Sequence, residues 1–115
     1  MGISLLRSGD KLLFSHRRLF EADQARYFVG VVDEFENDVV AVTGYTFVWD
    51  AMHGRFLQKK DQRTKLLTLS SGTLICYRIP TETNMAELRI EDRGEQPLVL
   101  TDGASFEMDM SDRMG

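Results

Sequence analysis

The sequence predicts an all-β fold, a small and strongly bent barrel of five antiparallel strands, and three observations favour it. Apolar and β-branched residues occur in short runs that are separated by Gly, Asn, Asp and Ser, the residues that favour turns. No run shows the apolar period of an amphipathic helix longer than two turns. The run at 38–50 is apolar on both of its alternating sets, with Gly44 in the middle. This pattern is typical of a strand that bends and serves two sides of one core.

The first 80 residues contain five runs that combine β-compatible residues with turn residues at their ends. The expected strands are 11–20, 27–35, 38–50, 66–69 and 73–79. A short turn of helix is expected before them at residues 3–7, where Gly9 follows as a stop. Residues 36–38 are expected to form a tight turn, because Asn and Asp tolerate left-handed backbone. Residues 52–64 are polar and are expected to form a loop.

The C-terminal residues differ from the rest of the chain in charge. Residues 1–80 carry 11 Lys or Arg against 9 Asp or Glu, whereas residues 81–115 carry 3 against 9. The acidic part nevertheless contains three short alternating runs, AELRIE, PLVL and SFEMDM, with more apolar residues than a disordered tail would have. We therefore expect a barrel domain at 1–80 and, at 81–115, an acidic C-terminal extension of short strands that pack on the barrel.

The composition is typical of one soluble domain, since 43% of the 115 residues are hydrophobic and 28% are charged. Cys76 is the single cysteine, so no disulfide can form within the chain, which suits a reducing compartment. No stretch approaches the roughly 18 consecutive apolar residues that span a membrane. Charged residues also interrupt the N-terminal region before an apolar signal segment could form. We expect a cytoplasmic protein with no membrane contact.

Motifs for catalysis and cofactor binding are absent from the sequence. It has no glycine-rich phosphate loop, no nucleophile elbow and no pair of cysteines for zinc. His16, His53 and Cys76 are too few for a metal site rich in His and Cys. A nucleophilic pair of Cys76 with a histidine stays open, and the carboxylates of 33–36 could serve acid-base chemistry only if two of them faced one pocket. We expect no enzyme, no metal and no cofactor.

Two segments carry a resemblance to a known family. The first runs from the apolar FVGVV at 28–32, through an acidic turn with Asn at 35–37, to the apolar VVAV at 39–42. The second is SGTLI at 71–75, which has a Gly-x-x-Ile spacing and is followed by Pro80. Together with a short N-terminal helix and five bent strands, these segments resemble the Sm-like fold of Sm and LSm proteins and of bacterial Hfq.

This resemblance implies a homo-oligomer, a ring of six or seven subunits, whose central pore binds single-stranded RNA by stacking and hydrogen bonding. The nearest matches to the RNA-binding residues of the family are Phe35, Asn37, Ser71 and Gly72. The sequence departs from the family pattern in two ways, because the turn after Gly30 is shorter and Ser71 replaces an arginine. The fold and the ring are therefore implied more strongly than RNA binding.

Two alternatives remain open at the level of the sequence. An SH3-like barrel could serve as a protein-interaction or structural scaffold without RNA, with Tyr27, Tyr45 and Trp49 under a proline-rich peptide. The densest basic group offers another site for RNA, although a solvated loop is the more common meaning of such a group. It consists of Arg55, Lys59, Lys60, Arg63 and Lys65. No feature indicates specificity for DNA.

Overall fold

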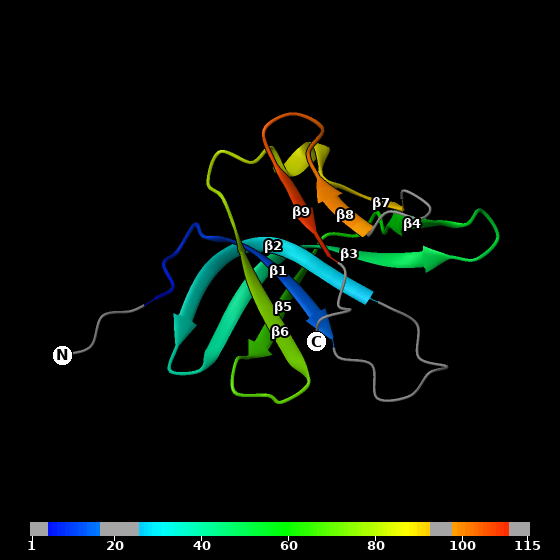
Figure 1. Cartoon of the computed structure of the whole chain (residues 1–115). Coiled ribbons are helices and arrows are strands. Elements are labelled where there is room, and N and C mark those ends of the chain that lie inside the picture. The colour runs from blue at the N-terminus through cyan, green and yellow to red at the C-terminus, as the bar shows by residue number, and fades with distance from the viewer. Residues whose placement is uncertain (1–4, 17–25, 93–97, 111–115) are drawn as a thin grey trace.

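A computed structural model describes residues 5–16, 26–92 and 98–110 of the chain, and these residues are all-β (Figure 1). They form two antiparallel sheets and one turn of 3-10 helix. In these ranges no helix has the length and apolar character that crossing a membrane requires. The expected fold class is therefore confirmed at the level of an antiparallel all-β protein.

The larger sheet contains six strands in the order β4-β3-β2-β1-β6, and β5 joins it beside β4 on the same edge of β3. Its strands are β1 (Lys11–His16), β2 (Arg26–Glu36), β3 (Val39–Asp50), β4 (Arg55–Gln58), β5 (Arg63–Thr68) and β6 (Leu74–Ile79). Strand β3 is long enough to pair with β5 through residues 39–44 and with β4 through residues 47–50. The expected turn between the second and third strands lies at Asn37 and Asp38. Residues 17–20 of the first expected strand lie outside the described residues.

The expected N-terminal helix is wrong for the part of it that is described, residues 5–7. The backbone here bonds to other partners: Gly9 N donates to the carbonyl oxygen of Val32 over 2.8 Å, and Arg7 N donates to the Asp10 carboxylate over 2.9 Å. These bonds form a turn, with Gly9 at a φ of 93°, which fastens the segment to β2. So short a segment gains more from this turn than from a single helical turn.

The polar segment 52–64 contains a strand that the sequence did not predict, and β5 begins earlier than expected, at Arg63. Strand β4 forms because the ring of Phe56 packs on two aromatic neighbours. Its centroid lies 5.2 Å from that of Trp49 and 5.6 Å from that of Tyr27. One aromatic side chain in a polar stretch was too weak a sequence signal to predict this hairpin.

The larger sheet curls but does not close into the expected barrel. Among the described residues β5 pairs only with β3, and β6 pairs only with β1. The side that we call the inner face holds a buried cluster to which both ends of the sheet contribute, because Leu67 of β5 and Leu74 of β6 pack against it. The cluster consists of Leu12, Phe14, Phe28, Val32, Val40 and Val42. The sheet therefore wraps around one apolar core and leaves the outward edges of β5 and β6 unpaired within the described ranges.

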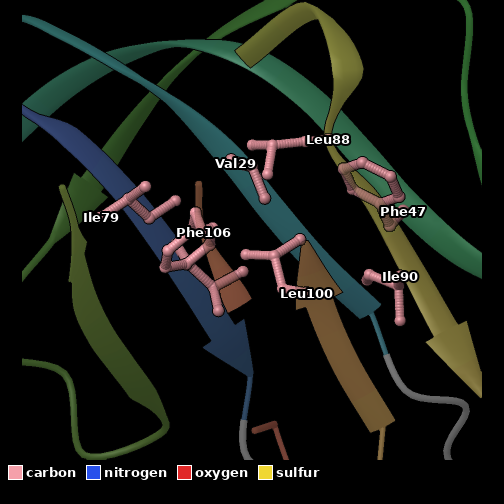
Figure 2. Close-up of a cluster of buried hydrophobic side chains, with 8 residues drawn as sticks. Val29, Phe47, Ile79, Leu88, Ile90, Leu100 and Phe106 are labelled. Atoms are coloured by element: carbon pink, nitrogen blue, oxygen red, sulfur yellow. The ribbon is translucent and has the colours of Figure 1, made fainter. Parts of the chain in front are cut away.

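The opposite side, the outer face, is covered in part by a second sheet in the order β7-β8-β9. This part of the chain contains η1 (Met85–Glu87), β7 (Arg89–Asp92), β8 (Leu98–Thr101) and β9 (Glu107–Asp109). Figure 2 shows side chains of both sheets pointing toward one another between the strands. This outer cluster consists of Leu13, Val29, Phe47 and Ile79 from the larger sheet, with Leu88, Ile90, Leu100 and Phe106 from the C-terminal part. Each such side chain contributes roughly 1.5–3 kcal/mol when it is fully buried.

The three expected runs of the C-terminal part thus supply β7, β8 and β9. The division of the chain at residue 80 into a barrel domain and an extension stays a prediction. Both sides of that division contribute to the outer cluster.

The curl of the sheet depends on a close approach of β2 and β3 at two glycines. Gly30 lies opposite Gly44 in the register. A Cβ atom at position 44 would lie 1.9 Å from the carbonyl oxygen of Val29, and one at position 30 would lie 2.5 Å from that of Thr43. Only residues without a side chain permit this separation. Gly44, where the sequence predicts a bend, is therefore a position at which main-chain atoms of β2 leave no room for a side chain on β3.

We expect Gly44→Ala to lower the free energy of unfolding by about 3 kcal/mol or more, because main-chain atoms rather than a flexible side chain would have to move. Urea unfolding measures this change. Gly72→Ala is the matched control, since a Cβ at position 72 meets nothing within 4 Å, and it should change stability by less than about 0.5 kcal/mol. Equal losses in the two variants would contradict the close approach.

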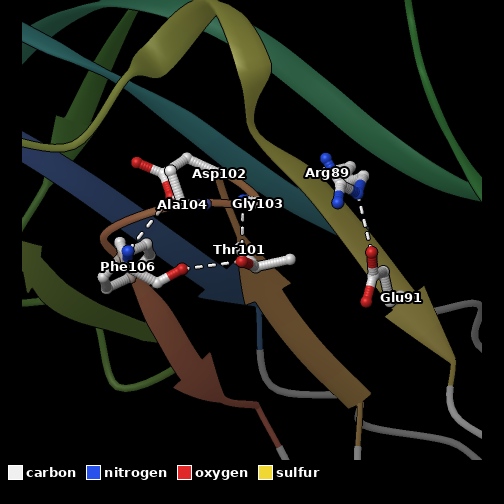
Figure 3. A network of polar contacts seen from close by, with 7 residues as sticks. All are labelled: Arg89, Glu91, Thr101, Asp102, Gly103, Ala104 and Phe106. Carbon is white, nitrogen blue, oxygen red and sulfur yellow. Dashed lines mark hydrogen bonds and ion pairs between the residues drawn. The ribbon is translucent and has the colours of Figure 1, made fainter.

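Asp102 organises the turn between β8 and β9. Its carboxylate accepts hydrogen bonds from the backbone N–H groups of Ala104, Ser105 and Phe106 at 2.9–3.0 Å, and from that of Asn84 at 3.0 Å. Figure 3 shows this turn beside Thr101, whose hydroxyl donates to the carbonyl oxygen of Phe106. The bond from Asn84 and the other backbone bonds hold the pKa of Asp102 far below its ordinary value. One ionised side chain thus joins the start of η1 to the β8–β9 turn.

Asp102→Asn should destabilise the protein at pH 7, because an amide offers one acceptor oxygen where the carboxylate offers two. The folded-state pKa is lowered, so the stabilisation by Asp102 is present above the unfolded pKa and is lost as the pH falls through the folded pKa. The difference in urea midpoint between wild type and Asp102→Asn should therefore shrink from pH 7 to pH 3. Glu87→Gln, at an exposed carboxylate of η1, is the control. A difference for Asp102→Asn that does not vary with pH would contradict this account.

Candidate functional site

The two turns that carry the resemblance lie side by side at one end of the larger sheet. Asp38 joins them, because its carbonyl oxygen accepts a bond from Leu69 N at 2.7 Å and its carboxylate accepts one from the Ser70 hydroxyl at 2.5 Å. Asn37 occupies the tip of its turn with a φ of 54°, the left-handed conformation that Asn tolerates. The structure thus places Phe35 and Asn37 in one turn region and Ser71 in its neighbour.

Ser71 and Gly72 serve the shape of their own turn. The Ser71 hydroxyl lies 2.9 Å from that of Thr73 and accepts a bond from Thr73 N at 3.3 Å. Gly72 has open space on the side where a Cβ would stand. Neither residue presents a charged group, so any contact of this turn with RNA would be through a hydroxyl or the backbone.

The surface at the β2–β3 turn is acidic. An open pocket of about 460 Å³ lies here, and Val39 and Leu66 are exposed apolar side chains on its wall. Its lining residues are Glu34, Phe35, Glu36, Asn37, Asp38, Val39, Ala41 and Leu66. Three of them are carboxylates and none is basic, so the pocket repels phosphate groups and suits a cationic or apolar contact.

The basic residues gather elsewhere, on the inner face. Arg63 and Lys65 lie opposite Gly44 and Val42, and the buried Val42 marks this side of β3. Residues opposite each other in antiparallel strands point to the same face, so both basic side chains are on the inner side. Lys59 continues β4, with its N–H donating to the carbonyl oxygen of Thr46, and follows the same alternation.

Two further basic groups reach this cluster from β1 and β2. Arg26 lies opposite Val48, on the inner face. His16 lies two residues after Phe14 in β1 and therefore points to the same inner face. Ser15 of β1 pairs with Tyr27 of β2. His16 follows Ser15 and Arg26 precedes Tyr27, so His16 and Arg26 are neighbours across the two antiparallel strands. We call this group the inner-face basic cluster. It consists of His16, Arg26, Lys59, Arg63 and Lys65.

Lys65 is the member that lies deepest. Its ammonium stands 4.6 Å from the centre of the Phe28 ring, a cation–π contact. The row of the sheet between Lys65 and Phe28 holds Gly30 and Gly44, so no side chain of β2 or β3 stands between them. The glycine pair that allows the sheet to curl therefore also makes room for this contact.

Electrostatics show that the cluster is crowded with positive charge. Partial burial lowers the pKa of Lys65, and the charges of Arg26, Arg63 and Lys59 lower it further. Partial burial also lowers the pKa of His16, followed by the charges of Lys65 and Arg26. Each group therefore loses part of its tendency to hold a proton, because its neighbours are also cationic.

The predicted basic loop is thus divided by the structure. Lys59, Arg63 and Lys65 join the inner-face basic cluster, whereas Arg55 lies opposite Asp50 at the far end of β4 and Lys60 is exposed beyond the strand. His16 and Arg26 were missed as members. His16 lies in the expected strand 11–20, but Arg26 precedes the expected strand 27–35, and the register that brings both residues to β5 was not visible in the sequence.

Cys76, His53 and Asp33 were the other candidates for chemistry, and the structure places each of them as follows. Partial burial raises the pKa of the Cys76 thiol, which is the opposite of an activated nucleophile. His53 Nδ1 lies 2.6 Å from Asp50 within the β3–β4 turn. Asp33 accepts a bond from Thr43 across the sheet at 2.5 Å. In the described part of the chain, no group of three or more His, Cys, Asp or Glu residues could hold a metal ion.

Two of the three aromatic residues of the SH3-like alternative pack against the ring of Phe56. Tyr27 lies beside this ring, and both residues pack against the outer cluster. Trp49 meets the ring of Phe56 edge to face. The SH3-like module stays a prediction.

We expect Lys65→Met to raise the pKa of His16, because it removes the charge with the larger effect of the two that oppose protonation of the imidazole. Titration of the His16 ring protons by nuclear magnetic resonance measures this shift. Lys60→Met removes a charge from the same loop outside the cluster and should leave the titration of His16 unchanged. An identical response to both variants would show that Lys65 and His16 do not share a site.

Comparison with protein-family models, with curated proteins and with solved structures found no match to this chain. Its function is therefore inferred from its own residues, strand order and charge.

Proposed function

We propose that the protein is an Sm-like subunit that assembles into a ring of identical copies and binds single-stranded RNA. The observation that carries the proposal is the pair of outward strand edges, on β5 and β6, that stay unpaired in the described ranges of the larger sheet. The strand order β5-β3-β2-β1-β6 leaves the fourth and fifth strands of an Sm-like subunit at the two ends of the sheet. The extra hairpin strand β4 falls where that family has a variable loop.

The edge strands also carry apolar surface. Leu66 on β5 is 75% exposed and Tyr77 on β6 is 40% exposed. An apolar strand edge that water faces directly is unusual in a monomer, because it invites pairing with another chain. Pairing β5 of one copy with β6 of the next is a contact between different surfaces, and such contacts repeat around a closed ring. The two free edges are consistent with a ring, and the number of six or seven copies comes from the family resemblance alone.

A second candidate function is favoured by the acidic pocket beside Asn37. Three carboxylates around exposed Val39 and Leu66 suit a partner with basic and apolar side chains. The chain would then be an SH3-like scaffold or protein-interaction module that binds no RNA. The two candidates differ in what the protein does alone, since only the ring needs copies of itself.

We expect light scattering at micromolar concentration to give a mass of six or seven times the 13.2 kDa of one chain. Leu66→Lys should reduce this mass, because it places a charge on the β5 edge, while circular dichroism shows that the subunit remains folded. Leu57→Lys, at a partly exposed position of β4, is the control and should leave the assembly intact. A monomeric wild-type protein would contradict the ring and leave the interaction module as the better account.

A further inference from the structure

Among the described residues, the inner-face basic cluster has far fewer carboxylates than cations, because only Asp61 forms an ion pair with one of its members. The one ion pair there joins Arg63 to Asp61 over 3.7 Å, and both side chains are largely exposed. Exposed pairs of this kind contribute little. Arg26, Lys59 and Lys65 have no acidic partner within the described ranges.

Such an arrangement is unfavourable in the free protein. Like charges held together on one surface repel one another, and this repulsion adds to the effect of partial burial in lowering the pKa values of Lys65 and His16. The chain has an excess of acidic residues overall, with a formal net charge of −4, yet Asp61 is the one described carboxylate that forms an ion pair with the cluster. A bound anion would relieve the repulsion, so the site is built to gain from an anionic ligand.

The spread of the cluster indicates what kind of anion. Its members come from the end of β1, the start of β2, the segment after β4 and the strand β5. Four of the five are exposed, and only Lys65 is partly buried against Phe28. A single enclosed phosphate needs donors that converge on one point, whereas separate exposed cations along a surface suit a chain of regularly spaced phosphates.

We propose that the inner-face basic cluster binds the phosphodiester backbone of single-stranded RNA. This inference rests on the proposed function for the class of ligand, and it assigns the phosphate contacts to this cluster instead of the acidic end of the sheet. Phe35 and Asn37 then remain available for contacts with bases. Arg26 and Lys65 are the central members, because Lys65 contacts the Phe28 ring and Arg26 is the neighbour of His16 at the start of β2.

The test is binding of a fluorescently labelled oligouridylate of about ten nucleotides, a length within the usual range for such sites, followed by anisotropy at low salt. We expect Arg26→Ala with Lys65→Met to weaken binding about tenfold or more, since two charge-assisted contacts are lost. The slope of log affinity against log salt should become shallower by about 1.4. Arg55→Ala with Lys60→Ala is the control, because it removes the same number of charges from β4 and the residues after it, outside the cluster.

Several results would overturn the inference. Equal weakening by the control pair would mean that only net charge matters. If the cluster variant binds as well as the wild type, and Phe35→Ala with Asn37→Ala abolishes binding, then the whole RNA site lies at the turns. If polyglutamate competes as strongly as unlabelled RNA, an acidic peptide is the better ligand. If uridine monophosphate competes as strongly, the cluster is a site for one phosphate.

The test of RNA binding by the cluster can be distinguished from the test of assembly into a ring. A monomeric wild-type protein that binds oligouridylate through the cluster would contradict the assembly and support the RNA site. An assembled wild-type protein that binds no oligouridylate would do the reverse.

Discussion

The structure depends on the close approach of the paired strands β2 and β3 at Gly30 and Gly44. A side chain at either position would overlap main-chain atoms of the facing strand. The sheet has two apolar faces, because successive apolar residues of its strands point to opposite sides. Val40 and Val42, before Gly44, reach the inner cluster, and Phe47, after it, reaches the outer cluster. One strand thus contributes to two cores, and the C-terminal sheet packs against the second of them.

The curl of the sheet separates the charges of the molecule. Carboxylates surround the β2–β3 turn, while the cations of β2 and β5 point to the inner face. The glycine pair leaves the space through which the Lys65 side chain reaches Phe28. A basic inner face and an acidic tip are consequences of register, because each charged residue follows the alternation of its strand. The proposed RNA site is therefore a property of the fold and not of a short motif.

Much of the fold could be predicted from the sequence, because local patterns determine it. The alternation on both faces of 38–50 predicted a bend at Gly44, and Asn37 with Asp38 predicted the turn. The three alternating runs of the C-terminal part predicted its strands. Strand β4 was not predictable in this way, since Phe56 packs against Trp49 and also against Tyr27, which is distant in sequence. The N-terminal turn likewise depends on Val32, a partner that local propensity does not reveal.

The candidate site was less predictable than the fold. Sequence grouping placed Arg55 and Lys60 together with Lys65, whereas the register separates them and adds His16 and Arg26. Neighbours across a sheet are set by long-range pairing, which composition and spacing along the chain do not contain.

The convergence of these cations on the inner face is tested most directly by the environment of Lys65 in a nuclear magnetic resonance spectrum. The account predicts nuclear Overhauser contacts between the ε-methylene protons of Lys65 and the ring protons of Phe28, with upfield shifts caused by the ring. Lys65 ε-protons at the chemical shift of an exposed lysine, with no contact to Phe28, would contradict it.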